Sequence, residues 1–335
     1  MQGIKLGIIG PGLIWDKTHR DIVRSMGKTF EVTALSARSE KTREKARGQF
    51  PRAAVYPDYR DLISSNDVEA VVILTPIPLN APVTLEVLAA GKHAIVEKPM
   101  GTSVDEATQI IEAEKKSSGN VYILEQFPQK TIIPEVKSIL EEGVLGRPLH
   151  FEYLAHNQLR EAAEGEAVSW GDTAWRQETA FPLGNIFDGG IHNLSLLQMI
   201  FGPPRSVISL GSNVRPTFGE YDTISSVLSY EKELIGTFSH SGYLPGVKNY
   251  LIIRGDKGAA EIGDQSVTIA YADGGEEERR VAYENESSRM WREIGRCIAS
   301  GTRAYYSSER TLLDLQLLEA IEKSLKERRQ VNLSE

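Results

Sequence analysis

Short runs rich in β-branched residues alternate with helical patterns up to about residue 145. The strand-like runs are IKLGIIG, EVTALSA, EAVVILT, KHAIVE and NVYILEQ, and the helical patterns begin near residues 12, 39, 58, 80 and 104. This strict alternation predicts a parallel sheet covered by helices on both faces, because parallel neighbours need long crossover connections. The first part of the chain is therefore predicted to be a doubly wound α/β domain of the Rossmann type, an architecture that binds nucleotides.

After the sequence EEGVLGRP the pattern becomes that of an α+β domain. An extended segment, PLHFEYLAH, precedes one helical pattern over residues 185–201, and β-rich runs separated by turn signals occupy residues 205–283. Two amphipathic helices, at about 286–300 and 309–328, close the chain. These runs predict a large, mostly antiparallel open sheet with helices to one side. We expect a dinucleotide-binding domain over residues 1–125 and a substrate-binding and oligomerisation domain over 126–335, whose final helix has the option of packing back on the first domain.

Charge, apolar patterning and cysteine count restrict the partners and compartments that we expect for this protein. The formal net charge of −8 argues against nucleic acid, because a phosphate backbone attracts basic surfaces. No apolar run reaches the roughly 18 residues of a membrane span, and the start MQGIKLGIIG has no signal-peptide pattern, so we expect a cytoplasmic protein without a membrane partner. The single cysteine, Cys297, excludes an internal disulfide and a cysteine metal cluster. An open sheet face predicts a homodimer or homotetramer.

A glycine turn follows the first predicted strand. Gly10 allows a tight turn and Gly12 allows the backbone to approach a pyrophosphate, whose charge the N-terminus of the following helix stabilises. We expect the pyrophosphate at Gly10, Gly12 and Leu13. Trp15 stands where the third glycine of the dinucleotide fingerprint falls, and that glycine mainly eases packing of the helix on the strand. We therefore expect the loop to hold a dinucleotide. The alternative is an ordinary strand-to-helix turn.

The end of the second strand indicates which cofactor binds. The sequence LSARSEK has Ser36 and Arg38 where an acid would hydrogen-bond the ribose 2′-hydroxyl of NAD. Hydroxyl groups and a guanidinium suit a 2′-phosphate, so we expect NADP to be preferred, with NAD possible. The alternative is that Arg38 is a solvated surface charge.

Two further signatures resemble those of one enzyme family. The stretch LTPIPLNAPVTLEVLAAGKHAIVEKPMG contains a Thr-Pro after the third strand, then AGKH, then EKP after the next strand; WRQETAFPLGNIFDGGIHNLSLLQMIFG contains Asp, Gly and His at the entry to a helix. Together with the closing segment they resemble the Gfo/Idh/MocA family of NAD(P)-dependent oxidoreductases, named for glucose-fructose oxidoreductase and inositol dehydrogenase. The matching positions are Thr75, Pro76, Glu97, Lys98, Pro99, Asp188, Gly190 and His192.

The chain departs from the family pattern at three places. Asn80 stands where many members have histidine, a glycine triplet before Asp188 is reduced to Gly184, and LEQFPQK replaces a commoner strand exit that contains arginine. These positions concern the substrate side and the nicotinamide end of the cofactor. They leave the substrate open.

Lys98 is a candidate catalytic residue on its position alone. A lysine beyond the C-terminal edge of a parallel strand points into the crevice where doubly wound folds bind ligands, and Pro99 restrains its backbone. Burial beside a cofactor would suit this amine to proton transfer or to polarising a substrate oxygen. The alternative is a surface lysine in a turn.

Asp188 and His192 form the second candidate pair. They are four residues apart, so a helix beginning near residue 185 would place them on one face. Such a pair can exchange a hydroxyl proton at the histidine while the aspartate orients it, although a capping aspartate and a half-buried histidine have the same spacing. Trp175 and Arg176, just upstream, either line a substrate pocket or pack between domains. Metal is not expected, since no cysteine pair or glutamate-flanked histidine pair accompanies these residues.

The resemblance implies an oxidoreductase that transfers a hydride between NADP(H) and a sugar, a polyol or a related carbonyl compound. In that reading Thr75 and Pro76 pass under the ribose and nicotinamide, Glu97 and Lys98 meet the nicotinamide end, and Lys98 and His192 exchange the proton. Two alternatives remain at this point. One is a non-catalytic NAD(P)-binding sensor, and the other is a relative that uses NAD transiently during glycoside cleavage.

Overall fold

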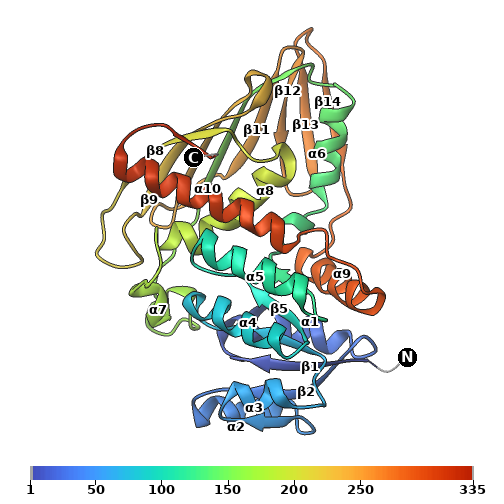
Figure 1. The fold of residues 1–335 in the computed structure, drawn as a ribbon. Coiled ribbons are helices and arrows are strands. Elements are labelled where there is room, and N and C mark those ends of the chain that lie inside the picture. The colour runs from blue at the N-terminus through green and yellow to red at the C-terminus, as the bar shows by residue number, and fades with distance from the viewer. Residues whose placement is uncertain (1–2, 334–335) are drawn as a thin grey trace. The chain divides into compact units, whose positions relative to one another are not determined.

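The computed structural model describes residues 3–333 of the chain. Its contacts divide these residues into two compact units. The first comprises the chain up to Gln126 together with Ser287–Leu315, and the second comprises Phe127–Glu286 with the C-terminal part from Gln316. Figure 1 shows the elements of both units along the chain.

The first unit contains a six-stranded parallel sheet, which confirms the predicted doubly wound architecture. Its strand order is β3-β2-β1-β4-β5-β6. The strands are β1 (Ile4–Ile9), β2 (Phe30–Ser36), β3 (Ala54–Tyr56), β4 (Ala70–Ile73), β5 (His93–Glu97) and β6 (Val121–Leu124). The edge strand β3 was not predicted, because three residues are too short to show a period.

Two helices of this unit begin where local capping signals predict. Ser39 and Asp58 accept backbone hydrogen bonds at the starts of α2 (Glu40–Gln49) and α3 (Tyr59–Ser64). The remaining helices are η1 (Trp15–His19), α1 (Arg20–Ser25), η2 (Ile77–Leu79), α4 (Asn80–Ala89), α5 (Val104–Lys116) and α9 (Glu286–Ser300), and α10 (Ser308–Glu327) begins here and continues into the second unit. One buried core joins β1, β4 and β5 to residues of η1, α1, α2 and α9.

The second unit contains the predicted mostly antiparallel sheet. It has nine strands in the order β14-β13-β12-β11-β7-β10-β9-β8-β15, and within it β10 and β7 form the parallel pair. The strands are β7 (Pro148–His156), β8 (Ser206–Ser212), β9 (Thr223–Ser229), β10 (Ile235–Ser241), β11 (Tyr250–Gly255), β12 (Gly258–Ile262), β13 (Ser266–Tyr271), β14 (Glu276–Arg280) and β15 (Val331–Asn332). The chain is thus a Rossmann sheet followed by a large, mostly antiparallel sheet, as predicted.

Helices of the second unit lie beside this sheet. In Figure 1, α6 (Ile132–Glu141) and α8 (Ile191–Phe201) pack against each other, and α6 also contacts β13. Shorter helical segments are η3 (Phe127–Gln129), η4 (Trp170–Asp172), α7 (Ala174–Gln177), η5 (Ile186–Gly190) and η6 (Glu231–Glu233). Residues of β7–β10, with Tyr250 of β11, line an open cavity of about 350 Å³, and apolar side chains such as Leu210 and Ile208 are exposed on these strands.

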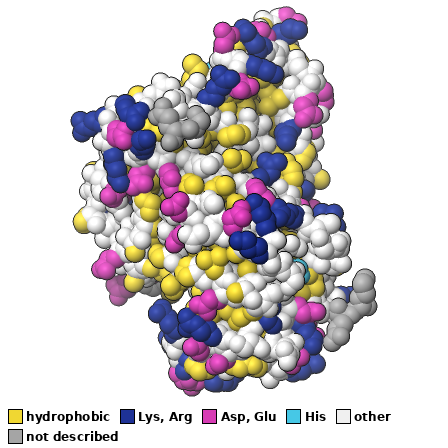
Figure 2. Space-filling view, viewed as in Figure 1, with side chains coloured by type: hydrophobic (Ala, Val, Ile, Leu, Met, Phe, Trp, Pro, Cys, Tyr) yellow, Lys and Arg dark blue, Asp and Glu magenta, His cyan; other side chains and the backbone are white. Residues whose placement is uncertain are grey.

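The surface and the helices give two further observations. Figure 2 shows basic and acidic side chains interleaved over the visible surface. Within residues 3–333 no helix is both long and apolar enough to cross a bilayer.

Candidate functional site

The glycine turn, Gly10 to Gly12, follows β1 and lies beside the C-terminal ends of the neighbouring strands β2 and β4. Gly10 has φ of +75°, and a Cβ there would lie 2.7 Å from the carbonyl oxygen of Leu74, so a side chain is excluded by both backbone and space. Its N–H donates to the carbonyl oxygen of Ser36 over 2.9 Å. Gly12 is different, because a Cβ there would meet nothing closer than 3.8 Å. The protein itself leaves the space over Gly12 open, as a turn that receives a pyrophosphate requires.

The helix after this turn contains a π-turn, η1, which sequence reasoning did not predict. Trp15 opens it and is fully buried, with its ring 6.0 Å from that of Phe50. The side chain at the third-glycine position thus points into the core. A π-turn holds one more residue than an α-turn, so the helix after the glycine turn departs from the regular repeat from Trp15 to His19.

Arg38 is exposed on the loop between β2 and α2, and Arg43 holds the backbone of this loop by hydrogen bonds. The Arg43 Nη1 donates to the carbonyl oxygens of Ala37 and Arg38, both over 2.7 Å. Glu40, the acid nearest to this loop, is paired with Arg43. Ser36 is only 3% exposed, so its side chain is less accessible than that of Arg38.

Thr75 and Asn80 connect the exits of β4 and β5. Thr75 Oγ1 donates to Asn80 Oδ1 over 2.8 Å, and Asn80 Nδ2 donates to the carbonyl oxygens of Glu97 (3.1 Å) and Pro99 (2.8 Å). Asn80 is fully buried. This departure from the family pattern therefore has an internal role: it holds the backbone on both sides of Lys98.

The carboxylate of Glu97 holds Lys98 from a second direction. Its Oε2 accepts the Lys98 backbone N–H over 3.1 Å, and its Oε1 lies 2.8 Å from His19 Nε2. The indole N–H of Trp291, on α9, donates to His19 Nδ1 over 3.0 Å. Sequence reasoning missed His19 and Trp291, since residues so far apart in the chain leave no local pattern.

In the second unit, Asp188 is paired with Arg176. Arg176 Nε donates to Asp188 Oδ2 over 2.6 Å, and the two side chains are 14% and 10% exposed. The guanidinium lies 4.0 Å from the ring centre of Trp175 and 5.4 Å from that of Trp170. A carboxylate held in this way suits an acceptor that orients a hydroxyl group better than a base, because removing its charge would break the ion pair. Three of the four predicted substrate residues are thus brought together.

His192, the fourth, lies at the junction of η5 and α8. Its ring stacks on Phe127 with centroids 5.0 Å apart. Its neighbour in sequence, Asn193, accepts a 2.6 Å hydrogen bond from the Tyr153 hydroxyl and lies 3.4 Å from the Nδ1 of His240. Complete burial lowers the pKa of His240 to about 3, so this ring is neutral at ordinary pH.

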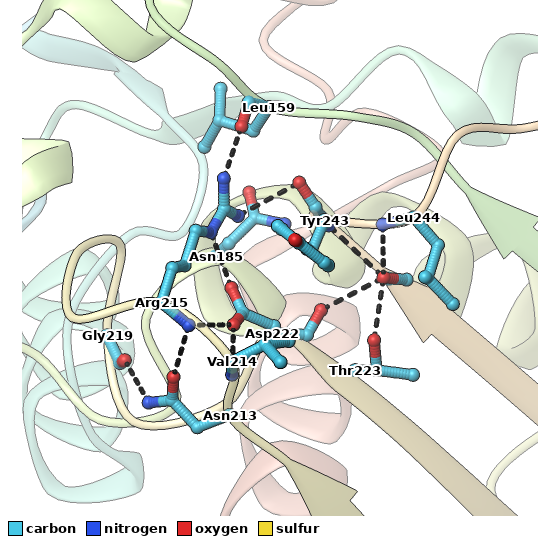
Figure 3. Close-up of polar contacts among 12 residues, drawn as sticks. Leu159, Asn185, Asn213, Val214, Arg215, Gly219, Asp222, Thr223, Tyr243 and Leu244 are labelled. Atoms are coloured by element: carbon cyan, nitrogen blue, oxygen red, sulfur yellow. Dashed lines mark hydrogen bonds and ion pairs between the residues drawn. The ribbon is translucent and has the colours of Figure 1, made fainter.

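A polar cluster around Arg215 anchors the segment that leads to Asp188 (Figure 3). Arg215 donates to Asp222 and to the carbonyl oxygens of Leu159 and Gly242 over 2.5, 2.5 and 2.9 Å. The loop that Arg215 fixes also accepts the Asn185 N–H at the carbonyl oxygen of Phe218, over 2.9 Å. Asn185, the residue before η5, is therefore attached to a loop that Arg215 connects to the carbonyl oxygens of Leu159 and Gly242. No sequence pattern indicated this cluster.

Comparison with known proteins places the chain. Residues 4–125 match the family described as "Oxidoreductase family, NAD-binding Rossmann fold", and residues 133–261 match the "GFO/IDH/MocA C-terminal domain". The chain belongs to the Gfo/Idh/MocA family. The resemblance in the two signatures is thereby confirmed, and the chain is an NAD(P)-dependent oxidoreductase of this family.

Individual relatives agree with this assignment. A mouse trans-1,2-dihydrobenzene-1,2-diol dehydrogenase is 29% identical over 275 residues, which is 78% of this chain and 75% of that protein. Among solved structures, an oxidoreductase from Thermotoga maritima superposes with a TM-score of 0.91 at 27% identity over 99% of both chains. A levoglucosan dehydrogenase in complex with NADH and levoglucosan shares the fold, with a TM-score of 0.85 at 18% identity over the whole of both chains. Over the first four curated relatives the match spans 54–75% of the relative's length.

The residues of the Gfo/Idh/MocA glycine turn fit a dinucleotide. Gly12 leaves room for a pyrophosphate, Gly10 cannot be replaced without a clash, and the helix after the turn begins beside them. No group of three His, Cys, Asp or Glu side chains within the described residues has an arrangement that could hold a metal ion.

Proposed function

We propose that this protein is an NADP-preferring dehydrogenase or reductase that acts on the CH–OH group of a sugar, a polyol or a related carbonyl compound. The observation that carries the proposal is the doubly held Lys98: Glu97 and Asn80 fix its backbone at the C-terminal edge of the parallel strands. A side chain that exchanges a proton must be held in a defined position relative to the substrate. Two separate sets of hydrogen bonds to the backbone around Lys98 favour such a position.

We assign the cofactor contacts to the first unit. Residues 10–13 hold the pyrophosphate, Ser36 and Arg38 face the adenosine ribose with its 2′-phosphate, Thr75 and Pro76 pass under the ribose and nicotinamide, and Glu97 and Lys98 meet the nicotinamide end. The bound nicotinamide accepts or supplies the hydride. The exposed Arg38 on a loop stiffened by Arg43 supports NADP over NAD, because a 2′-phosphate takes a guanidinium well.

We assign proton transfer to Lys98 and His192 and substrate orientation to Asp188. The Arg176–Asp188 pair has no net charge, so it suits a neutral hydroxyl-bearing substrate better than a free carboxylate. Trp175 and Arg176 contribute a flat, half-buried surface of the kind that sugar and cyclic diol rings pack against. The names of two relatives, a dihydrodiol dehydrogenase and a levoglucosan dehydrogenase, point to the same class.

The domain roles follow from these assignments. Residues 1–125 bind the cofactor, and residues 126–335 bind the substrate and support self-association. The apolar side chains exposed on β8 and β9, including Leu210 at 71% exposure, favour a homodimer or homotetramer through the open sheet.

The test is the change in nicotinamide absorbance with NADP and with NAD against aldoses, inositols, keto-sugars and cyclic vicinal diols, in both directions. We expect turnover with at least one member of this panel, and at least a hundredfold loss in K98A. K116A, which alters an exposed lysine at the C-terminal end of α5, is the control and should keep full activity. Tight NADPH binding without turnover on any compound would contradict the proposal and favour a sensor.

A further inference from the structure

A chain of three side chains, of which Trp291 and His19 are buried and Glu97 is 12% exposed, runs from α9 to the backbone of Lys98. Trp291 donates to His19 Nδ1 over 3.0 Å, His19 Nε2 lies 2.8 Å from Glu97 Oε1, and Glu97 Oε2 accepts the Lys98 N–H over 3.1 Å. Trp291 is completely buried and His19 is 2% exposed. Each link is of ordinary hydrogen-bond length, and water is excluded from the middle of the chain.

The chemistry of the three groups sets the direction of every hydrogen bond. An indole N–H can only donate, so His19 Nδ1 must be an acceptor and carries no proton. In the neutral ring the proton is then on Nε2, from which it is donated to the carboxylate of Glu97. Trp291 therefore selects one of the two tautomers of His19. The other tautomer would place two N–H groups against each other and leave the carboxylate of Glu97 facing a bare nitrogen.

We propose that Trp291 is a positioning residue for Lys98, acting through the tautomer of His19 and the carboxylate of Glu97. This inference rests on the role proposed above for Lys98. With its Oε1 held by His19, the Glu97 carboxylate keeps one orientation, and its Oε2 holds the Lys98 amide. Helix α9 thereby controls the C-terminal edge of the parallel sheet at Lys98, although it contributes no group to that edge.

The local structure is arranged for this contact. His19 is the last residue of the π-turn η1, and one residue fewer in that turn would rotate its ring by about 100° away from Glu97. Asn80 donates to the carbonyl oxygens of Glu97 and Pro99, whereas the Trp291–His19–Glu97 chain accepts the N–H of Lys98. The two networks therefore bind different backbone groups of the same short segment. Loss of either network would remove hydrogen bonds that hold the backbone around Lys98.

Packing alone does not account for the indole of Trp291. Its ring packs edge-on against Phe30 and His19, with centroids 5.4 and 5.7 Å apart, and phenylalanine could make similar contacts. What phenylalanine lacks is the donor. The same core contains a second fully buried indole, Trp15, whose Nε1 has no hydrogen-bond partner among the described residues. The two tryptophans therefore separate the effect of a lost donor from that of a lost ring.

The experiment compares W291F with W15F in the full-length protein. Two-bond ¹H–¹⁵N spectra of the histidine rings should show His19 with its proton on Nε2 in the native protein and in W15F, and a mixture of tautomers in W291F. Hydrogen exchange at the Lys98 amide should accelerate in W291F and remain as in the native protein in W15F. These two readouts need no turnover, so they test the inference even where the proposed function fails.

Kinetics then tests the link to Lys98. We expect W291F to lower kcat about tenfold while KM for NADPH changes less than about twofold, because displacing a reacting group affects the chemical step first. H19Q, whose amide carries one donor and one acceptor, should keep more of kcat than H19L. A W291F protein that retains the Nε2–H tautomer, or loses no more kcat than W15F, would overturn the proposal and leave Trp291 as core packing.

Discussion

Arg176 and Asp188 meet through a 2.6 Å hydrogen bond from Nε to Oδ2, with both side chains largely withdrawn from solvent. The guanidinium is at the same time stacked on Trp175. This pair links the short helix α7 to the π-turn η5, two segments that carry all the predicted substrate residues except His192. Its geometry gives Asp188 a fixed orientation and a permanent counter-charge.

The first prediction concerns this ion pair. R176A should leave Asp188 partly buried without its cation, which lowers the free energy of unfolding by about 2 kcal/mol and kcat/KM by about 100-fold. R176K restores the charge without the planar fork or the stacking on Trp175, so it should fall between R176A and the native enzyme. Chemical denaturation and steady-state kinetics measure both effects. An R176K enzyme indistinguishable from the native one would show that the geometry of the pair is unimportant.

Arg38 should decide between the two cofactors. R38A is expected to raise the Kd for NADPH at least tenfold and to change that for NADH less than twofold, because only NADPH carries the 2′-phosphate that a guanidinium would bind. The fold should be unaffected, since Arg38 is exposed. Fluorescence titration with both cofactors measures this, with K41A as a control for general loss of positive charge. Equal weakening for both cofactors would contradict the assignment of Arg38.

The two glycines of the turn should respond differently to alanine. G10A forces a left-handed residue to carry a Cβ 2.7 Å from the Leu74 carbonyl oxygen, and should cost about 1–3 kcal/mol of stability. G12A meets no atom of the protein closer than 3.8 Å and should keep the native melting temperature while losing at least tenfold in cofactor affinity. Thermal unfolding with and without NADPH separates the two cases. Full cofactor affinity in G12A would remove Gly12 from the binding site.

His240 should make stability depend on pH. Its folded-state pKa of about 3 lies below the ordinary value near 6.5, chiefly because burial disfavours the cation and also because His156 and His192 are near. Below pH 6.5 the unfolded chain therefore binds a proton that the folded protein does not. Stability should fall as the pH drops from 6.5 toward 3, by at most about 1.4 kcal/mol per pH unit from this residue.

The measurement for His240 is urea unfolding between pH 7 and pH 5, where most carboxylates remain charged. H240Q should show a shallower loss of stability over this interval than the native protein. The neighbouring amides of Asn185 and Asn193 do not titrate, so they contribute no slope of their own. Parallel curves for the two proteins would mean that His240 is not the group responsible.

The exposed side chain of Leu210 should report on self-association. L210D places a charge on the open sheet beside the cavity and should shift the mass measured by light scattering toward that of a monomer. V247D, at a loop position that is 97% exposed, is the control and should leave the mass unchanged. A native protein that is itself monomeric at micromolar concentration would contradict the proposed assembly.

Much of the architecture could be predicted because the relevant signals are local. Strand and helix patterns alternate over short runs, and the capping residues Ser39 and Asp58 directly precede their helices. Gly10, Lys98 and Asp188 each lie within a few residues of the strand or helix that positions them. Periodicity and capping follow from the geometry of the backbone, so they can be recognised without knowing what packs against what. The family followed from the same short motifs.

What only the tertiary structure decided involves residues that are distant in sequence or helices that depart from the regular α-helical repeat. The π-turns at 15–19 and 186–190 insert a residue whose position is set by packing, not by a local pattern. Asn80, which the sequence associates with the substrate side and the nicotinamide end of the cofactor, also holds the backbone around Lys98. The hydrogen bond between Trp291 and His19 joins the two chain segments that make up the first unit. Hydrogen bonds between distant residues form only when the fold brings them together. This is why the supports around Lys98 could not be predicted, while the candidate site residues could be proposed from local motifs.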